Sequence, residues 1–170
     1  MHLSLFNSSD PIDLLMNEHD GVLKHLSKLC DATNSVRADG YSYAAFREIV
    51  EAIRILSEEV LQHNRKEEKY LFPLLGHHVH DPLSRMREEH RELWHAFEQA
   101  HRCIQSIEEE QFDDRGIGEL VEASADIVTL LGEHFAHEGG MIFPLAKQVP
   151  SHEEYEQFKE DIASSAIHDG

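Results

Sequence analysis

HNRKEEKYLFP occupies residues 63–73, and HFAHEGGMIFP occupies residues 134–144. Both stretches read His-x-x-x-Glu, then four further residues, then Phe-Pro. A further histidine precedes each stretch, His19 for the first and His90 for the second, and each of these residues in the second copy lies 71 positions after its counterpart. One such motif arises easily in a chain rich in His and Glu, but a common offset across six ligand-type residues does not. The sequence therefore indicates a duplicated helical hairpin.

Long stretches with helical periodicity favour an all-α fold. The chain has 170 residues with only nine Gly and five Pro, which is long enough for one domain with a substantial core. Apolar residues spaced three and four apart predict four helices. The first begins at Ser9-Asp10-Pro11, the second covers about 43–75, the third runs from Pro82 to about 110, and the fourth covers about 117–147. The connections between them are expected to be a loop over 31–40, a turn over 76–81 and a loop over 112–116. Four helices with short connections predict an up-down-up-down antiparallel four-helix bundle.

A short extra helix is expected after the bundle. Pro150-Ser151, with Glu154 three residues after the serine, is a capping-box signature. We expect a single domain over residues 1–170, with a bundle core over about 10–148 and a C-terminal helix and tail over 151–170. Residues expected in the core or an interface include Leu15, Met16, Leu23, Trp94, Tyr41, Tyr43, Tyr70, Cys30 and Cys103.

Composition excludes several classes of partner. The net charge is −18 at pH 7, and both nucleic acid and an anionic membrane surface attract cationic patches. The first residues lack the basic segment and long apolar run of a signal peptide, and no stretch approaches the length of a membrane span. We therefore expect a cytoplasmic protein with no nucleic-acid or membrane partner. Its protein partners stay open, as does assembly into a homo-oligomer.

The duplicated motif carries metal-ligand chemistry. Residues four apart share a helix face, so His63 and Glu67 point the same way, as do His134 and Glu138. Counting residues from the connecting turns places the histidines at one level of the bundle. The candidate metal ligands are His19, His63, Glu67, His90, His134 and Glu138. These six residues are more donors than one tetrahedral zinc ion binds, and they suit two six-coordinate ions bridged by carboxylates.

From Asp10 to about Pro150 the order of these motifs resembles the hemerythrin-like, or HHE cation-binding, family. The resemblance implies an antiparallel four-helix bundle around a non-haem di-iron centre with an oxo or hydroxo bridge; members of this family are standard examples of such bundles. It also implies that His19 and His63 bind one iron and that His90 and His134 bind the other. Glu67 and Glu138 would bridge the two ions. Zinc or another divalent ion can occupy such a site in the purified protein.

Two positions depart from the pattern of the oxygen-carrying members. Those proteins have a further histidine where this chain has Trp94, and a bridging aspartate where it has Gly139. Here Glu138 stands in for the aspartate, and four histidines replace five. The resemblance therefore implies a more open site, similar to those of bacterial iron-sulfur-repair proteins and eukaryotic iron-sensing domains.

Several further residues stay open as members of the site. His95, His137 and Tyr70 lie close enough in sequence to join it, and Glu18 and Glu89, which precede the first histidine of each copy, either hydrogen-bond the ligands or are exposed charges. The histidines expected to be ordinary polar residues are His25, His101, His77, His78 and His80.

The function predicted from the resemblance is a binding module for O2 or NO, or a sensor of iron or redox state. The alternative is an enzyme, either a di-iron oxidase or peroxidase or one of nitric-oxide or iron-sulfur-repair type. A ferritin-like enzyme is disfavoured, because that class needs a Glu-x-x-His motif on each of two helices. The motif Glu92-Leu-Trp-His95 has no counterpart 71 positions earlier, where Gly21 and Lys24 stand.

Overall fold

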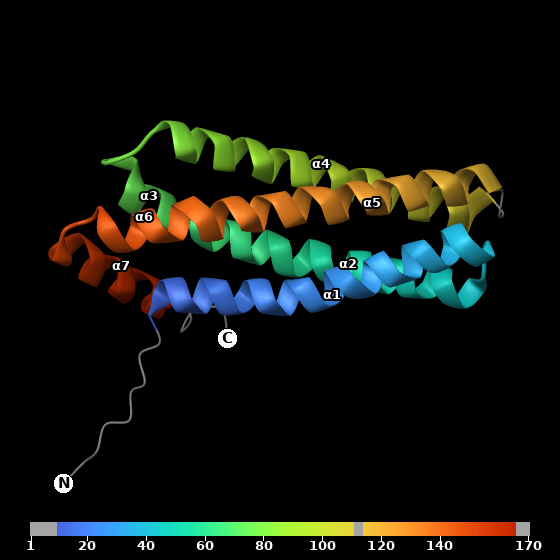
Figure 1. Cartoon of the computed structure of the whole chain (residues 1–170), viewed down its shortest axis with the longest axis horizontal. Helices are drawn as coiled ribbons and strands as arrows, with labels where there is room; N and C mark the ends of the chain where they lie inside the picture. The colour runs from blue at the N-terminus through green and yellow to red at the C-terminus, as the bar shows by residue number, and fades with distance from the viewer. Residues whose placement is uncertain (1–9, 111–113, 166–170) are drawn as a thin grey trace, which may run out of the picture.

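Four long antiparallel rods and one short helix make up the computed structural model, which describes residues 10–110 and 114–165 (Figure 1). The first rod is α1 (Pro11–Asp39) and the third is α4 (Asp81–Glu110). The second consists of α2 (Tyr43–Lys66), η1 (Glu67–Leu71) and α3 (Phe72–Gly76), and the fourth of α5 (Asp114–His137), η2 (Glu138–Ile142) and α6 (Phe143–Gln148). The short helix is α7 (His152–Ser165), and no strand occurs within the described ranges. The predicted all-α bundle with an extra C-terminal helix is confirmed.

Capping residues fix where the helices begin. Asp10 accepts a hydrogen bond from the Ile12 backbone N–H at 2.9 Å, with Pro11 in the first turn of α1. Ser42 accepts one from the backbone N–H of Ala45 at 3.1 Å. The predicted capping box before α7 is confirmed, because the backbone N–H of Ser151 donates to Glu154 at 2.6 Å and that of Glu154 donates to Ser151 at 3.2 Å. Ser9, part of the predicted start, lies outside the described residues.

The predicted loop over 31–40 is wrong, because α1 continues to Asp39. Ala32, Thr33 and Val36 extend the buried stripe of the helix. The Thr33 hydroxyl donates to the Leu29 carbonyl at 2.7 Å, which satisfies it inside the helix. The chain turns only at Gly40, whose φ of 83° suits glycine. The polar residues of this segment suggested a loop, whereas they form the solvent face of one further helical stretch.

The other boundaries shift by a few residues. α4 begins at Asp81 instead of Pro82, and α5 begins at Asp114, inside the predicted loop over 112–116. Residues 111–113 and the C-terminal end of the predicted tail, 166–170, lie outside the described residues.

Two π-helical segments, which the sequence analysis did not predict, interrupt the second and fourth rods. η1 begins at Glu67 and η2 at Glu138, and the backbone N–H groups of Phe72 and Phe143 donate to the carbonyls of these two glutamates, five residues back. Each segment ends immediately before Phe-Pro. Proline has no N–H to donate and crowds the preceding turn, so a locally wider turn accommodates it without ending the rod. Such insertions are often found at functional sites.

The core consists of two apolar clusters along the bundle. One contains Ile12, Leu15, Leu71, Phe72 and Phe143 among others, and the larger one extends from Val22 and Leu93 to the opposite end. On α1, His19 lies between the two clusters, and on α4 His90 does. A polar layer therefore separates two apolar regions.

Some residues predicted to lie in the core are exposed. Met16 and Leu23 are 47% and 43% exposed, because each lies one residue, about 100° around the helix, from the buried Leu15 and Val22. Trp94 is 43% exposed, and Tyr41 and Tyr43 are exposed as well. Cys103 is buried as expected, whereas Cys30 is only partly buried.

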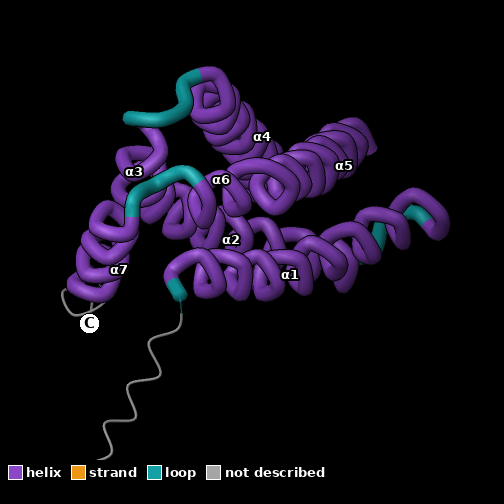
Figure 2. Tube along the Cα trace, turned by 60° about the vertical axis from the view of Figure 1, so that its left-hand side comes forward, coloured by secondary structure: helices purple, strands orange, loops and turns teal. Residues whose placement is uncertain are grey.

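α7 packs across the end of the bundle where α1 begins (Figures 1 and 2). Phe158 inserts into the apolar cluster at that end and is 3% exposed. The Tyr155 hydroxyl donates to the Asp10 carboxylate, at 2.9 and 2.8 Å from its two oxygens. This contact joins the start of the first helix to the last helix. No helix in the described ranges combines the length and the apolar character needed to cross a membrane.

Replacing Tyr155 by Phe removes this hydrogen bond to a charged group and is expected to lower the free energy of unfolding by about 1–2 kcal/mol. Urea unfolding followed by circular dichroism measures the change. Tyr43→Phe, at a position 64% exposed, is the matched control and should change stability by less than about 0.5 kcal/mol. Equal effects of the two substitutions would show that the contact contributes nothing.

Candidate metal centre

The six predicted ligand residues converge in the polar layer. None of them is more than 8% exposed. Their side chains form two groups, His19, His63, Glu67 and Glu138 in one and Glu67, His90, His134 and Glu138 in the other, with the candidate ligand atoms of each group within 4.8 Å of one another. The two groups share both glutamates. The structure thus assembles two adjacent four-residue sites from all four rods.

Each shared carboxylate presents one oxygen to each pair of histidines. Glu67 has Oε1 at 3.4 Å from Nε2 of His63 and Oε2 at 3.3 Å from Nε2 of His90. Glu138 has Oε2 at 2.7 Å from Nε2 of His19 and Oε1 at 2.8 Å from Nε2 of His134. This is the arrangement that a carboxylate bridging two cations requires. Each glutamate lies one helical turn after its histidine and is the first residue of a π-helical segment.

Three of the four imidazoles are held from behind by carboxylates. The Nδ1–H of His63 donates to Glu18 at 2.8 Å, and that of His134 donates to Glu89 at 3.1 Å. The Nδ1–H of His90 donates to Glu68 at 2.7 Å. We call these three glutamates the outer carboxylates. Such contacts fix the tautomer and leave Nε2 free to bind a metal. The open alternative for Glu18 and Glu89 is therefore resolved in favour of hydrogen bonding.

Glu68 was missed by the sequence analysis. Its counterpart in the second copy is Gly139, so the 71-residue register gave no signal for it. The only hint was its place next to Glu67. In keeping with the missing counterpart, no hydrogen bond from Nδ1 of His19 occurs within the described ranges.

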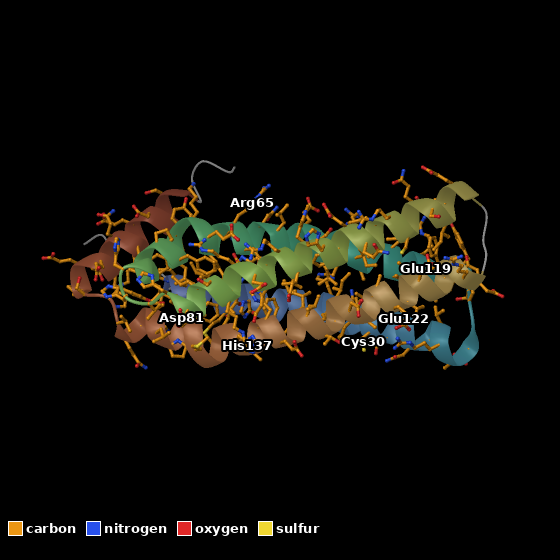
Figure 3. The ribbon with its side chains drawn as sticks, turned by 90° about the horizontal axis from the view of Figure 1, so that it is seen from above. Cys30, Arg65, Asp81, Glu119, Glu122 and His137 are labelled. Atoms are coloured by element: carbon orange, nitrogen blue, oxygen red, sulfur yellow. The ribbon has the colours of Figure 1, made fainter. Side chains whose placement is uncertain are left out.

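His137 supports the site from outside. Its Nδ1 donates to Glu89 at 2.7 Å, and its Nε2 accepts from Arg85 at 2.8 Å. Lys66, the counterpart of His137, likewise donates to Glu18. Figure 3 shows His137 at the outer edge of the fourth rod, and neither ligand group includes it.

The remaining candidates do not enter the ligand groups. The His95 side chain is 77% exposed and lies 3.6 Å from Glu98, so it is not a fifth ligand at the centre. Tyr70 is partly buried and packs against the apolar cluster next to α7, and its part in the site stays a prediction. Of the polar histidines, His25 pairs with Glu59 at 3.8 Å, His78 with Glu154 at 3.1 Å and His101 with Ser57 at 3.2 Å.

Aromatic rings pack against the imidazoles from the opposite copy. Phe72 stacks on His90 with ring centroids 5.4 Å apart, and Phe143 lies 5.3 Å from the ring of His19. Phe135 stacks on His19 at 3.8 Å. The phenylalanine of each Phe-Pro therefore walls the centre, a role that the sequence analysis did not assign to it.

The imidazoles and carboxylates of the centre shift one another's pKa values. Burial alone would raise the pKa of Glu138, but the imidazoles of His134, His19 and His63, at 2.8, 2.7 and 3.8 Å from its oxygens, outweigh burial and hold that pKa well below its usual value. Burial alone would lower the pKa of His63, but the charge of Glu67, the nearby carboxylate of Glu138 and the hydrogen bond to Glu18 raise it well above its usual value. The pKa of His134 is raised in the same way, mainly by Glu138. The centre therefore favours positive charge beside its carboxylates.

The donor set fits metal ions better than it fits protons. Both carboxylate oxygens of Glu67 and of Glu138, together with Nε2 of His90 and of His134, are buried and lack hydrogen-bond geometry to any partner in the described ranges, although several lie at ion-pair distance. Each unsatisfied buried polar atom costs about 1–3 kcal/mol. Cations between the imidazoles and carboxylates would satisfy all of them at once.

The family comparison agrees with this geometry. The model of the hemerythrin HHE cation-binding domain matches residues 10–146. The chain belongs to this family. As a hemerythrin-like protein it is a helical cation-binding module, and its matched region includes all six convergent residues and ends before α7. Comparison with curated proteins and with solved structures gave no significant match.

Removing an outer carboxylate is expected to weaken metal binding. Glu89→Gln and Glu18→Gln each weaken the hold on one imidazole, and contacts of this kind are worth about 10–100-fold in metal affinity. Competition with a chromogenic chelator measures the affinity. Glu88→Gln, an exposed neighbour on α4, is the control and should bind like the unmodified protein. Affinities that match the control in both variants would contradict the role of the outer carboxylates.

The metal-free protein is expected to be most stable between about pH 4.5 and 6.5, the usual values for Glu and His. The raised pKa values of His63 and His134 stabilise the fold fully below the unfolded value of 6.5, and this contribution is lost as pH rises through the folded values. The lowered pKa of Glu138 stabilises it above 4.5, and this contribution is lost as pH falls further.

Urea unfolding of chelator-treated protein across this range tests the prediction. The metal-loaded protein should show the opposite trend above pH 6.5, because metal binding requires deprotonated imidazoles and displaces their protons. A metal-free protein whose stability rises steadily above pH 6.5 would contradict the assigned shifts.

Proposed function

We propose that this hemerythrin-like domain binds two iron ions and uses them to bind O2 or NO or to sense iron or redox state. His19 and His63 would hold one ion and His90 and His134 the other, with Glu67 and Glu138 shared between them. The observation that carries the proposal is the sharing of both carboxylates, one oxygen toward each histidine pair. When bound, an iron pair supplies reversible ligand binding or a change of charge on oxidation.

Nitrogen and oxygen donors support iron over a softer metal. Imidazole and carboxylate suit iron, zinc and other borderline ions, whereas copper(I) and iron–sulfur clusters prefer thiolates. Neither Cys30 nor Cys103 belongs to the two ligand groups. Two histidines and two shared carboxylates per ion leave positions free on a six-coordinate metal, which is what binding of a small ligand requires.

An enzyme is the second candidate, favoured by the exposed Trp94. The family's oxygen carriers have a histidine ligand at this position, and here the indole is 43% exposed and outside the ligand groups. The ion at His90 and His134 would then have a further open position. An oxidase, a peroxidase or a nitric-oxide-handling activity needs such an opening for its substrate.

Elemental analysis with Mössbauer spectroscopy tests the iron proposal. We expect two iron ions per chain in the unmodified protein, and preferential loss of one in His63→Ala. His101→Ala, an exposed histidine on α4, should retain both. One ion per chain, or equal stoichiometry in His63→Ala, would contradict the proposed ligand set.

Stopped-flow absorption of the reduced protein mixed with O2 or NO separates the two functions. A binding module or sensor should form a stable adduct or undergo a single stoichiometric oxidation. Repeated turnover with added reductant would instead support the enzyme. No spectral change with either gas would rule out both.

A further inference from the structure

A groove between α2 and α4 borders the metal centre on the side of His90. Its volume is about 240 Å³, and a cavity of about 150 Å³ is known to hold a benzene ring. Val60, Leu93 and Phe97 form its buried apolar wall, and none of them is more than 3% exposed. The groove is thus larger than O2 or NO requires and suits an aromatic ring.

The internal repeat shows that this groove is specific to one half of the molecule. Asn64 lines it, while Phe135 holds the equivalent position in the other half and stacks on His19 at 3.8 Å. The smaller side chain leaves space beside His90 that the phenylalanine fills beside His19. Trp94 lines the groove as well, and Leu23 is its equivalent. An indole wall is therefore present on one side only.

The charge of the rim differs between the halves in the same way. Arg65 and Arg91 line the groove, and their equivalents are Ala136 and Asp20. Both guanidiniums are exposed, and neither forms an ion pair within the described ranges. Figure 3 shows Arg65 on the outward side of α2. Two unpaired guanidiniums at one rim match a carboxylate, and they stand out in a chain of net charge −18.

We propose that this groove binds a small aromatic carboxylate, with its ring between Trp94 and the apolar wall and its carboxylate at Arg65 and Arg91. Glu68 also lines the groove, and it accepts the Nδ1 hydrogen bond of His90 at 2.7 Å. A bound ligand would therefore lie next to the contact that orients one metal ligand. The inference goes beyond the proposed function and does not depend on which metal the centre holds.

Trp94 is the single tryptophan of the chain, so its fluorescence reports on the groove directly. Titration of the purified 170-residue protein with benzoate should give a saturable change, with a dissociation constant on the order of 1 mM. Benzyl alcohol, which has the ring without the charge, should bind at least about tenfold more weakly, and benzoate binding should weaken with added salt. Equal affinities for the two probes, or no saturable change with benzoate, would overturn the proposal.

Two sets of variants locate the site. Asn64→Phe introduces the residue of the other half and should weaken benzoate binding at least about tenfold, as should the double variant Arg65→Ala with Arg91→Asp. Arg54→Ala removes an exposed arginine of α2 that does not line the groove and should bind like the unmodified protein. Unchanged binding in Asn64→Phe or in the double variant would place benzoate elsewhere and overturn the proposal.

Metal content and circular dichroism melting keep the result separate from the metal proposal. Both should be unchanged in the arginine variants, since neither arginine forms an ion pair with a ligand residue among the described residues. If Asn64→Phe does not fold, Trp94→Leu replaces it, with saturation-transfer NMR of benzoate as the readout. Loss of the NMR signal in Trp94→Leu is expected, and retention at full strength would contradict the assigned wall. Failure to find iron in the unmodified protein would leave these outcomes unaffected.

Discussion

Two carboxylates and four imidazoles buried in the middle of an apolar bundle are the constraint on which the rest of the structure depends. Glu67 and Glu138 are completely buried, and an ionised group in such a place requires charged or hydrogen-bonding partners. Without metal, His63 and His134 supply that charge, since their pKa values are raised; with metal, the bound cations would supply it. Apolar clusters on both sides of the layer exclude water from it and strengthen both kinds of interaction.

The two halves of the duplicated sequence each provide charged and hydrogen-bonding partners for the buried layer, and they do so with nearly the same residue types. In each half a glutamate one turn after its histidine is shared by both sites, and an outer carboxylate accepts a hydrogen bond from that histidine. A cation, Lys66 in one half and Arg85 in the other, donates to that outer carboxylate. The differences between the halves are therefore informative. Gly139 in place of Glu68 leaves His19 without an outer carboxylate, and Phe135 in place of Asn64 covers it with an aromatic ring instead. Phe135 therefore covers His19, whereas His90 borders a groove.

The parts of the site that were predictable follow from local periodicity. A spacing of four residues places His63 and Glu67 on one helix face whatever surrounds them. The common offset of 71 residues identifies the equivalent residues in the second half. The outer carboxylate Glu68 and the packing of Phe72 on His90 were not predictable in this way, because each joins residues on different rods. Likewise the exposure of Met16 and Trp94 depends on which edge of a helix faces a neighbour, and hydrophobicity alone does not determine that.

The sequence by itself determined the all-α bundle, its duplication and the six residues that meet in its centre, because helix periodicity and chain length fix heights along antiparallel rods. Only the tertiary structure decided that each carboxylate turns one oxygen to each histidine pair, since the histidines of the two pairs lie on four different rods. It also decided that α1 continues past residue 31, because the packing of Ala32 and Val36 on neighbouring helices outweighs the local preference of a polar segment.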